Sequence, residues 1–284
     1  MTLKKVAILH HPHSEGALAF ARQLAHDFIR RGVEATVADV WSPTAKDLLV
    51  DVGLIVCIGG DGTVLRAARL AVPNGAPLLG INMGRLGFLT DMSPRDFYNH
   101  FERILLEDWR IEERLMVRAD LFDGDITPTE HHGLNDIVVS RSSPGRPIYV
   151  DLAIDHAHVA VYRCDGMIVS TPTGSTGYSL SAGGPILAPT EHHLVVTPVS
   201  AHLSLARSLV LQPTSVVELR VTSDHGAILS VDGQDDVQVA SGSLVRIRQS
   251  EHVTRFARFA DPSLFYSELA EKLDMQMSSA VNRA

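Results

Sequence analysis

Three absences narrow the function of this 284-residue chain. No block of five or more basic residues occurs and the net charge is −8, so nucleic acid is not an expected partner. The two cysteines, Cys57 and Cys164, have neither CxxC spacing nor a disulfide pattern, which is typical of a reducing compartment. The N-terminus holds no apolar run long enough for a signal peptide or a membrane span. We therefore expect a cytoplasmic protein that binds no membrane.

Recognised metal-ligand motifs are also missing, although the chain has 14 histidines. The histidines gather in short groups such as His131 and His132, and none has the HExxH spacing of a zinc site. We interpret most of them as loop and surface residues.

The sequence pattern divides the chain into two regions. Residues 1–112 alternate apolar strand runs with helix signals, which predicts a Rossmann-like α/β domain with a parallel sheet. Residues 113–261 contain many short strand-like runs separated by turn residues, which predicts an all-β, sandwich-like domain. The tail, from about residue 262 to 284, is expected to form a helix that packs back on the first domain.

The first chemical motif is the stretch GGDGT, residues 59–63, between a continuously apolar strand and a predicted helix that opens at Thr63. Gly59, Gly60 and Gly62 let backbone N–H groups approach a ligand closely, and a helix N-terminus favours anions. Ligands bind at this place in open α/β sheets. The alternative is a tight turn with Asp61 as a solvated cap. The stretch is neither a Walker loop nor GxGxxG.

The second motif, residues 163–186, is more specific. Within its core TPTGSTGYSLSAGG, the nine residues from Thr173 to Ser181 carry five Ser and Thr hydroxyls, with interleaved glycines and one aromatic ring, Tyr178. Such a loop can bond ribose hydroxyls and phosphate oxygens while the ring covers a base. A third motif, Asn135-Asp136, opens an apolar strand, where an ordinary turn pair would also fit.

Taken together, the three motifs resemble the NAD kinase family, which combines a GGDGT loop, an Asn-Glu pair and a long DG…TPTGSTAYSLSAGGPI segment in this order. The resemblance implies an α/β domain, a β-rich domain and an active site between them. It implies transfer of the γ-phosphate of ATP to the 2′-hydroxyl of the adenosine ribose of NAD, with Mg²⁺ or Mn²⁺ and in a homodimer or homotetramer. NADH as acceptor and inorganic polyphosphate as donor stay open.

By the same resemblance, Asp61 is the catalytic residue that orients or deprotonates the acceptor hydroxyl. The residues implied in NAD binding are Asp61, Gly62, Asn135, Asp136, Arg146, Arg163, Asp165, Thr173, Thr176, Gly177, Tyr178, Ser179, Leu180, Ser181, Ser200, His202 and Gln234, with Asp232 beside them. Those expected at the phosphates of ATP are Gly59, Gly60, Gly62, Thr63 and Arg66. For Arg66 a surface ion pair is an equal alternative.

Three positions depart from the family pattern. Asp136 stands where Glu is usual, Gly177 where alanine is typical, and Ser200-Ala201 where a proline often precedes the histidine.

Two other functions stay open. Diacylglycerol and sphingosine kinases also carry GGDGT, although the hydroxyl-rich loop favours a sugar–nucleotide over a lipid. A non-catalytic dinucleotide sensor is the other, although it would be expected to lose Asp61.

Overall fold

The computed structural model describes residues 2–72, 74–84, 87–90, 92–124, 127–201 and 207–281, and only the backbone of 274–281. By its contacts the chain divides into two compact units. Unit 1 comprises residues 1–113 and 254–284, and unit 2 comprises residues 114–253.

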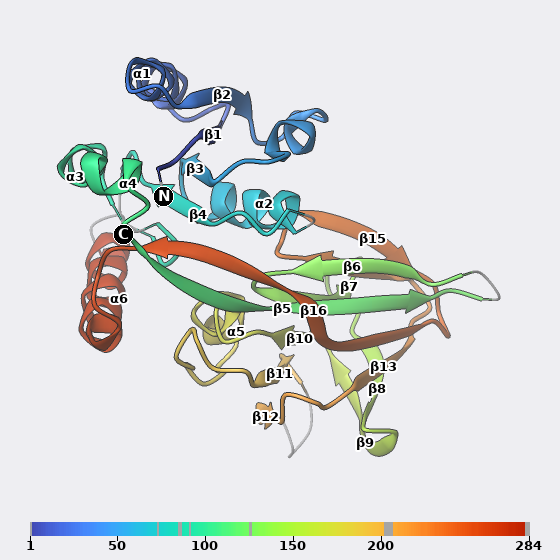
Figure 1. Cartoon of the computed structure of the whole chain (residues 1–284). Coiled ribbons are helices and arrows are strands. Elements are labelled where there is room, and N and C mark those ends of the chain that lie inside the picture. The colour runs from blue at the N-terminus through green and yellow to red at the C-terminus, as the bar shows by residue number, and fades with distance from the viewer. Residues whose placement is uncertain are drawn as a thin grey trace. The chain divides into compact units, whose positions relative to one another are not determined.

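Unit 1 is built on parallel strands in the order β2-β1-β3-β4 (Figure 1). Its elements are β1 (Lys5–His10), α1 (Ala17–Arg30), β2 (Glu34–Asp39), η1 (Ala45–Leu49), β3 (Leu54–Ile58), α2 (Asp61–Ala71), β4 (Leu78–Ile81), α3 (Pro94–Asn99), α4 (Phe101–Leu105), η3 (Pro262–Leu264) and α6 (Phe265–Val281). The predicted parallel α/β sheet is confirmed.

Strands β1, β3 and β4 of unit 1 are covered on both faces, which explains their continuous apolar runs. Val6 and Ile8 of β1 lie in one core cluster with residues of α1, α3 and α4. Their neighbours Ala7 and Leu9 point the other way and are equally buried. On that side α2 packs against β3 and β4.

The boundaries of two helices follow from local chemistry. At α3 the side chain of Ser93 accepts from the backbone of Asp96, which bonds back to Ser93, a capping box reinforced by Pro94. The expected start of α2 at Thr63 is wrong by two residues. The helix begins at Asp61 because Gly60, in extended conformation, takes the N-cap position.

Unit 2 consists of antiparallel strands in two sheets. The first has the order β12-β11-β10-β7-β14-β15, and the second contains β8, β9 and β13 with β5, β6 and β16. The bounds are β5 (Arg110–Phe122), β6 (Thr129–Gly133), β7 (Asp136–Arg141), β8 (Ile148–Ile154), β9 (Ala157–Cys164), β10 (Gly166–Ser170), η2 (Gly174–Thr176), α5 (Tyr178–Ser181), β11 (Leu194–Val199), β12 (Leu209–Leu211), β13 (Val217–Thr222), β14 (Ala227–Val231), β15 (Asp235–Val239) and β16 (Leu244–Arg258). Both sheets contribute to one core, so the predicted sandwich-like β part is confirmed.

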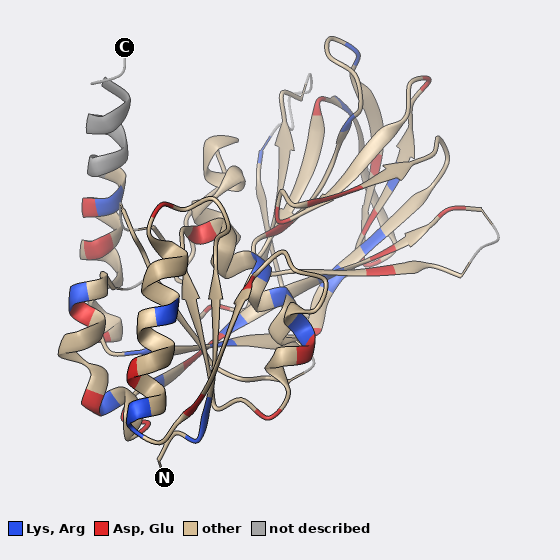
Figure 2. Ribbon diagram, turned by 90° about the horizontal axis from the view of Figure 1, so that it is seen from above, with Lys and Arg blue, Asp and Glu red and all other residues tan. Residues whose placement is uncertain are grey.

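Two further observations bear on the sequence predictions. Lys and Arg are interspersed with Asp and Glu along the described helices and strands (Figure 2). Within the residues that the structure describes, no helix is long and apolar enough to cross a bilayer.

Candidate active site

The turn between β3 and α2 lies at the topological switch point of the parallel sheet. The chain leaves β1 toward β2 on one side and leaves β3 toward β4 on the other. In open α/β sheets, ligands bind outside the carboxyl ends of the strands at such a point. A side chain at Gly59 would collide with the hydroxyl of Thr63 and would come within 3.2 Å of His11 Cβ. The glycine is therefore required for this turn.

Asp61 stands in the first turn of α2, and its carboxylate is held by two backbone donors. The N–H of Phe88 donates to Oδ2 at 2.8 Å, and the N–H of Leu89 donates to Oδ1 at 3.0 Å. A Cβ added at Gly87 would overlap this carboxylate, so only glycine permits the approach. The arrangement fixes the direction of a half-buried carboxylate while leaving further lone pairs on both oxygens.

The segment that supplies these donors was not predicted as part of the site. It follows β4, and its own side chains hold it in shape. Asn82 accepts from the N–H of Gly84 at 2.7 Å and donates to Thr90 Oγ1 at 3.1 Å. The N–H of Gly87 donates to the same hydroxyl at 3.0 Å. Two glycines after a buried strand were the available signal, as they were for the GGDGT turn.

A buried cation also belongs to this part of unit 1. Arg258, at the end of β16, is 6% exposed and pairs with Glu112 at 3.1 Å. Burial lowers the pKa of Arg258 to about 10, while the carboxylates of Glu268 and Asp61 oppose the change. Arg258 therefore places positive charge near Asp61, which sequence reasoning also missed.

The other ATP-site predictions lie on the same turn and helix. Gly60 and Gly62 are exposed, Thr63 is buried, and Arg66 is half-buried one turn into α2.

In unit 2, the carboxylate of Asp232 organises the Asn135-Asp136 pair. It accepts from the backbone N–H of Leu134 at 2.9 Å, of Asn135 at 2.7 Å and of Asp136 at 3.2 Å. The N–H of Asp232 donates in turn to the carbonyl of Asp136 at 3.0 Å. Asp232 adopts a left-handed conformation with φ 53°, which Asp tolerates better than most residues. The third motif and the VDGQ stretch are thus one structure.

Asp136 is the second carboxyl of this pair. It is 5% exposed, and burial together with the charge of Asp232 raises its pKa to about 7. Near neutral pH the side chain can therefore either donate or accept a hydrogen bond.

The hydroxyl-rich loop after β10 is joined to the same place. The N–H of Thr171 donates to the carbonyl of Asn135 at 2.8 Å, and its hydroxyl donates to the carbonyl of Leu134 at 2.6 Å. A side chain at Gly174 would overlap the carbonyl of Asn135, so this glycine allows the loop to pass. The second and third motifs therefore meet.

The hydroxyls of this loop divide into two groups. Ser175 and Ser179 are fully buried, and their hydroxyls bond Pro172 O at 2.6 Å and Thr197 Oγ1 at 3.2 Å. Thr173 is buried as well. In contrast, the loop exposes or partly exposes Thr176, Gly177, Tyr178, Leu180 and Ser181. The buried hydroxyls hold the loop in shape, and the accessible residues are available to a ligand.

A buried acceptor of the third motif is left unsatisfied in the part of the chain that the structure describes. Asn135 Oδ1 is buried with no hydrogen bond among the described residues. A Cβ at Gly177 would lie 3.6 Å from Asn135 Nδ2, so this loop also approaches the amide. Such a buried acceptor marks a place where a ligand donor fits.

Two of the remaining predicted NAD residues, Asp165 and Ser200, lie at the other end of β10. That strand pairs Ser170 with Asp136 at one end and Gly166 with Val199 at the other. Asp165, which bonds Arg141 at 2.8 Å, and Ser200 belong to the second end. Of the other residues, Arg146 and Arg163 are exposed, Arg146 contacts His225, Gln234 is half-buried beyond Asp232, and His202 lies outside the described residues.

Comparison with known proteins is consistent with this geometry. The family model of the ATP-NAD kinase N-terminal domain matches residues 31–108, and that of the ATP-NAD kinase C-terminal domain matches residues 134–259. An NAD kinase of Chloroflexus aurantiacus is 38% identical over 274 residues, which cover 95% of this chain and 99% of that protein. The chain belongs to the ATP-NAD kinase family. It is an enzyme that phosphorylates NAD with ATP, and the lipid-kinase and sensor alternatives are not supported.

Other members of the family extend the likeness. An NAD kinase of Heliobacterium modesticaldum is 44% identical over 233 residues, 82% of each chain. The crystal structure of an NAD kinase from Archaeoglobus fulgidus in complex with ATP has a TM-score of 0.77 at 27% identity and covers 95% of this chain and 98% of that one. Yeast NADH kinase in complex with NADH, 22% identical with a TM-score of 0.79 over 92% of this chain and 84% of that one, has the same fold.

Proposed function

We propose that Asp61 is the catalytic residue of this NAD kinase. It orients the 2′-hydroxyl of the adenosine ribose of NAD and accepts its proton. The observation that carries the proposal is the carboxylate held by the N–H groups of Phe88 and Leu89 at the sheet's switch point. A carboxylate fixed in direction supplies the alignment on which phosphoryl transfer depends.

The step itself is an in-line displacement. The ribose oxygen forms a bond to the γ-phosphorus of ATP, the bond from that phosphorus to the bridging oxygen breaks, and ADP leaves. The proton of the hydroxyl passes to Asp61 late in the step, because a carboxylate is a weak base toward an alcohol. Orientation is therefore the larger part of its role.

The phosphates of ATP are proposed to bind the turn Gly59–Thr63 and Arg66. This turn lacks bulky side chains and opens α2, whose N-terminal N–H groups attract anions. Because no P-loop lysine follows, backbone N–H donors and Arg66 are proposed to stabilise the negative charge of the ATP phosphates.

NAD is proposed to bind the structure built around Asn135 and Asp136. The orphaned Asn135 Oδ1 supports this, because an adenine amino group or a ribose hydroxyl would supply its donor. The proposal keeps the residues predicted from sequence: Asp61, Gly62, Arg146, Arg163, Asp165, Thr173, Thr176, Gly177, Tyr178, Ser179, Leu180, Ser181, Ser200, His202 and Gln234. Within this set, the internal bonding of Ser179 indicates support of the loop.

A divalent cation fits the donor chemistry at Asp61. The carboxylate offers hard oxygen ligands, and Mg²⁺ or Mn²⁺ typically takes one or two carboxylates and completes its shell with phosphate oxygens and water. Such a cation would be held by Asp61 and would supply positive charge against the phosphates of ATP.

Other expectations from the family resemblance stay predictions. They are a homodimer or homotetramer, a cytoplasmic location, polyphosphate as an alternative donor, and domain limits of 1–112 with the C-terminal helix and 113–261. Both cysteines are buried and free, which supports a reducing compartment.

The direct test incubates the purified protein with NAD, ATP and Mg²⁺ and detects NADP with an NADP-specific dehydrogenase. NADP formation by the wild type that disappears in Asp61→Ala supports the proposal. Asp96→Asn is the matched control, because Asp96 is also an acid that bonds backbone N–H at a helix start, far from any proposed role. Activity retained in Asp61→Ala would contradict the assignment, as would equal loss in both variants.

A further inference from the structure

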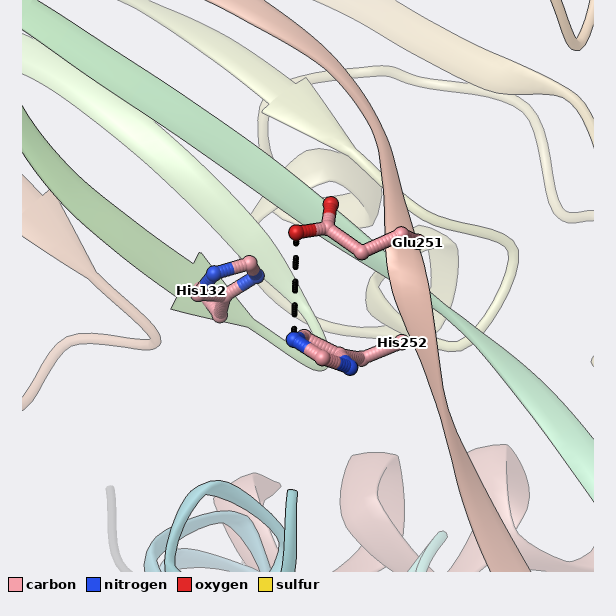
Figure 3. A group of neighbouring side chains, drawn as sticks. All are labelled: His132, Glu251 and His252. Carbon is pink, nitrogen blue, oxygen red and sulfur yellow. Dashed lines mark ion pairs between the residues drawn. The ribbon is translucent and has the colours of Figure 1, made fainter. Parts of the chain in front are cut away.

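A group of nitrogen and carboxylate donors in unit 2 includes none of the residues proposed for catalysis or for NAD binding. His132 stands on β6, and Glu251 and His252 stand on β16 (Figure 3). One ligand atom from each of the three lies within 4.8 Å of the other two. Sequence reasoning did not find this group, because β6 ends at Gly133, β16 begins only at Leu244, and no HExxH spacing is present.

The two imidazole rings are close and already oriented. Their centroids are 5.1 Å apart and the rings are tilted by 60°. Consecutive residues of a strand ordinarily point to opposite faces, yet Glu251 and His252 both reach this group, and His252 Nε2 lies 3.8 Å from Glu251 Oε1. Figure 3 shows the three side chains directed toward one another.

A second carboxylate, that of Glu130, fixes the orientation and tautomer of the His132 ring. Glu130 Oε1 lies 2.6 Å from Nε2 of His132, and Ser250 Oγ lies 2.8 Å from Nδ1. A carboxylate that accepts from one ring nitrogen fixes the tautomer, so that the other nitrogen carries the lone pair. This is how proteins prepare an imidazole for a metal ion.

The charges around the group favour a dication. Arg118 pairs with Glu251 at 3.0 Å and with Glu130 at 2.6 Å, so one guanidinium faces both carboxylates. Asp120 adds a third carboxylate, 2.8 Å from Arg118 and 3.6 Å from Arg248. With neutral imidazoles, three carboxylates against two guanidinium groups leave one negative charge.

We propose that His132, Glu251 and His252 form a binding site for a transition-metal dication of the Zn²⁺ class. Two imidazole nitrogens and one carboxylate suit Zn²⁺ and its neighbours, whereas Mg²⁺ prefers oxygen ligands alone. The site is therefore distinct in chemistry from the cation that accompanies ATP. Water completes the coordination, and Glu130 stays hydrogen-bonded to His132.

The ion would join two strands that lie far apart in the sequence. β6 ends at Gly133 and leads directly into Leu134 and Asn135, whose N–H groups bond Asp232. A metal bound only by the folded chain stabilises it by mass action, so Zn²⁺ is expected to raise the unfolding temperature.

The test titrates Zn²⁺ into the metal-free full chain by calorimetry, with Co²⁺ visible absorption reporting bound nitrogen and oxygen ligands. The double variant His132→Ala/His252→Ala is expected to bind Zn²⁺ at least about 10-fold more weakly. The chain offers a matched control, His192→Ala/His193→Ala. Glu191-His192-His193 repeats the order of Glu130-His131-His132, without a third ligand gathered around it in the described residues.

A second variant separates loss of the site from loss of the fold. Glu251→Gln keeps the side-chain volume and removes the charge, and it is expected to weaken Zn²⁺ binding while NADP formation with Mg²⁺ continues. Equal Zn²⁺ affinity in the wild type and the His132/His252 variant would overturn the proposal. Equal weakening in the His192/His193 control would overturn it too.

Discussion

Two carboxylate structures, one in each unit, use backbone N–H groups in different ways. In unit 1, two N–H groups from a distant segment fix Asp61, which stays half-buried with lone pairs to spare. In unit 2, three N–H groups converge on Asp232, which is 8% exposed and whose partner Asp136 receives none among the described residues. The first arrangement orients the Asp61 carboxylate and leaves it accessible to a ligand. The second fixes the backbone of residues 134–136, which are proposed to bind NAD.

The close approach at Gly87 gives the largest expected effect on the first arrangement. Gly87→Ala places a Cβ against the carboxylate of Asp61 and must turn it away. Misplacement of a catalytic group by about 1 Å costs on the order of 100-fold, so kcat is expected to fall by about that factor. Steady-state kinetics with NAD and ATP measure it.

Gly84→Ala is the control for this prediction. Among the described residues, a Cβ there would have only Asn82 Oδ1 within 4 Å, at an ordinary 3.8 Å. Similar turnover in the Gly84 and Gly87 variants would show that the position of Asp61 does not depend on this glycine.

The second arrangement is broken by Asp232→Asn. The amide keeps one acceptor oxygen and turns an NH₂ group toward a backbone donor, so charge-assisted bonds are lost. The free energy of unfolding, from urea denaturation, is expected to fall by about 2 kcal/mol. Asp236→Asn, on the neighbouring strand β15 and exposed, should change it by less than about 0.5 kcal/mol. Equal losses in the two variants would contradict the role given to Asp232.

Asp136→Asn tests the second arrangement through the pH dependence of the free energy of unfolding. Because the folded pKa of Asp136 is about 7 and its ordinary value is 3.8, the folded state binds more protons between these values. Stability is therefore lost as pH rises through this window, by at most about 1.4 kcal/mol per pH unit. Between about pH 5 and pH 6, the wild type should lose about 1 kcal/mol more than Asp136→Asn. Parallel pH profiles for the two proteins would exclude a raised pKa.

Much of the fold could be predicted from sequence because its signals are local. The buried strand Leu54–Ile58 is an unbroken apolar run, and Ser93-Pro94 is a helix start that needs no tertiary information. The start of α2 was misplaced because Gly60 can be either a turn residue or a cap.

The site was predictable only where its residues formed a contiguous motif. GGDGT and the loop after β10 stand out in the sequence, whereas Gly87, Arg258 and the bonds from Asp232 to residues 134–136 depend on tertiary contacts. Burial also altered the meaning of a motif, since hydroxyls expected to face a nucleotide, such as Ser179, bond within the protein.

The most direct measurement compares turnover and NAD affinity in Asp61→Asn. This variant keeps the size of the side chain and removes its charge and basicity. The account predicts that kcat falls by about 10²–10⁴-fold while the NAD dissociation constant from calorimetry changes modestly. Near-normal turnover in this variant would contradict the central role of Asp61.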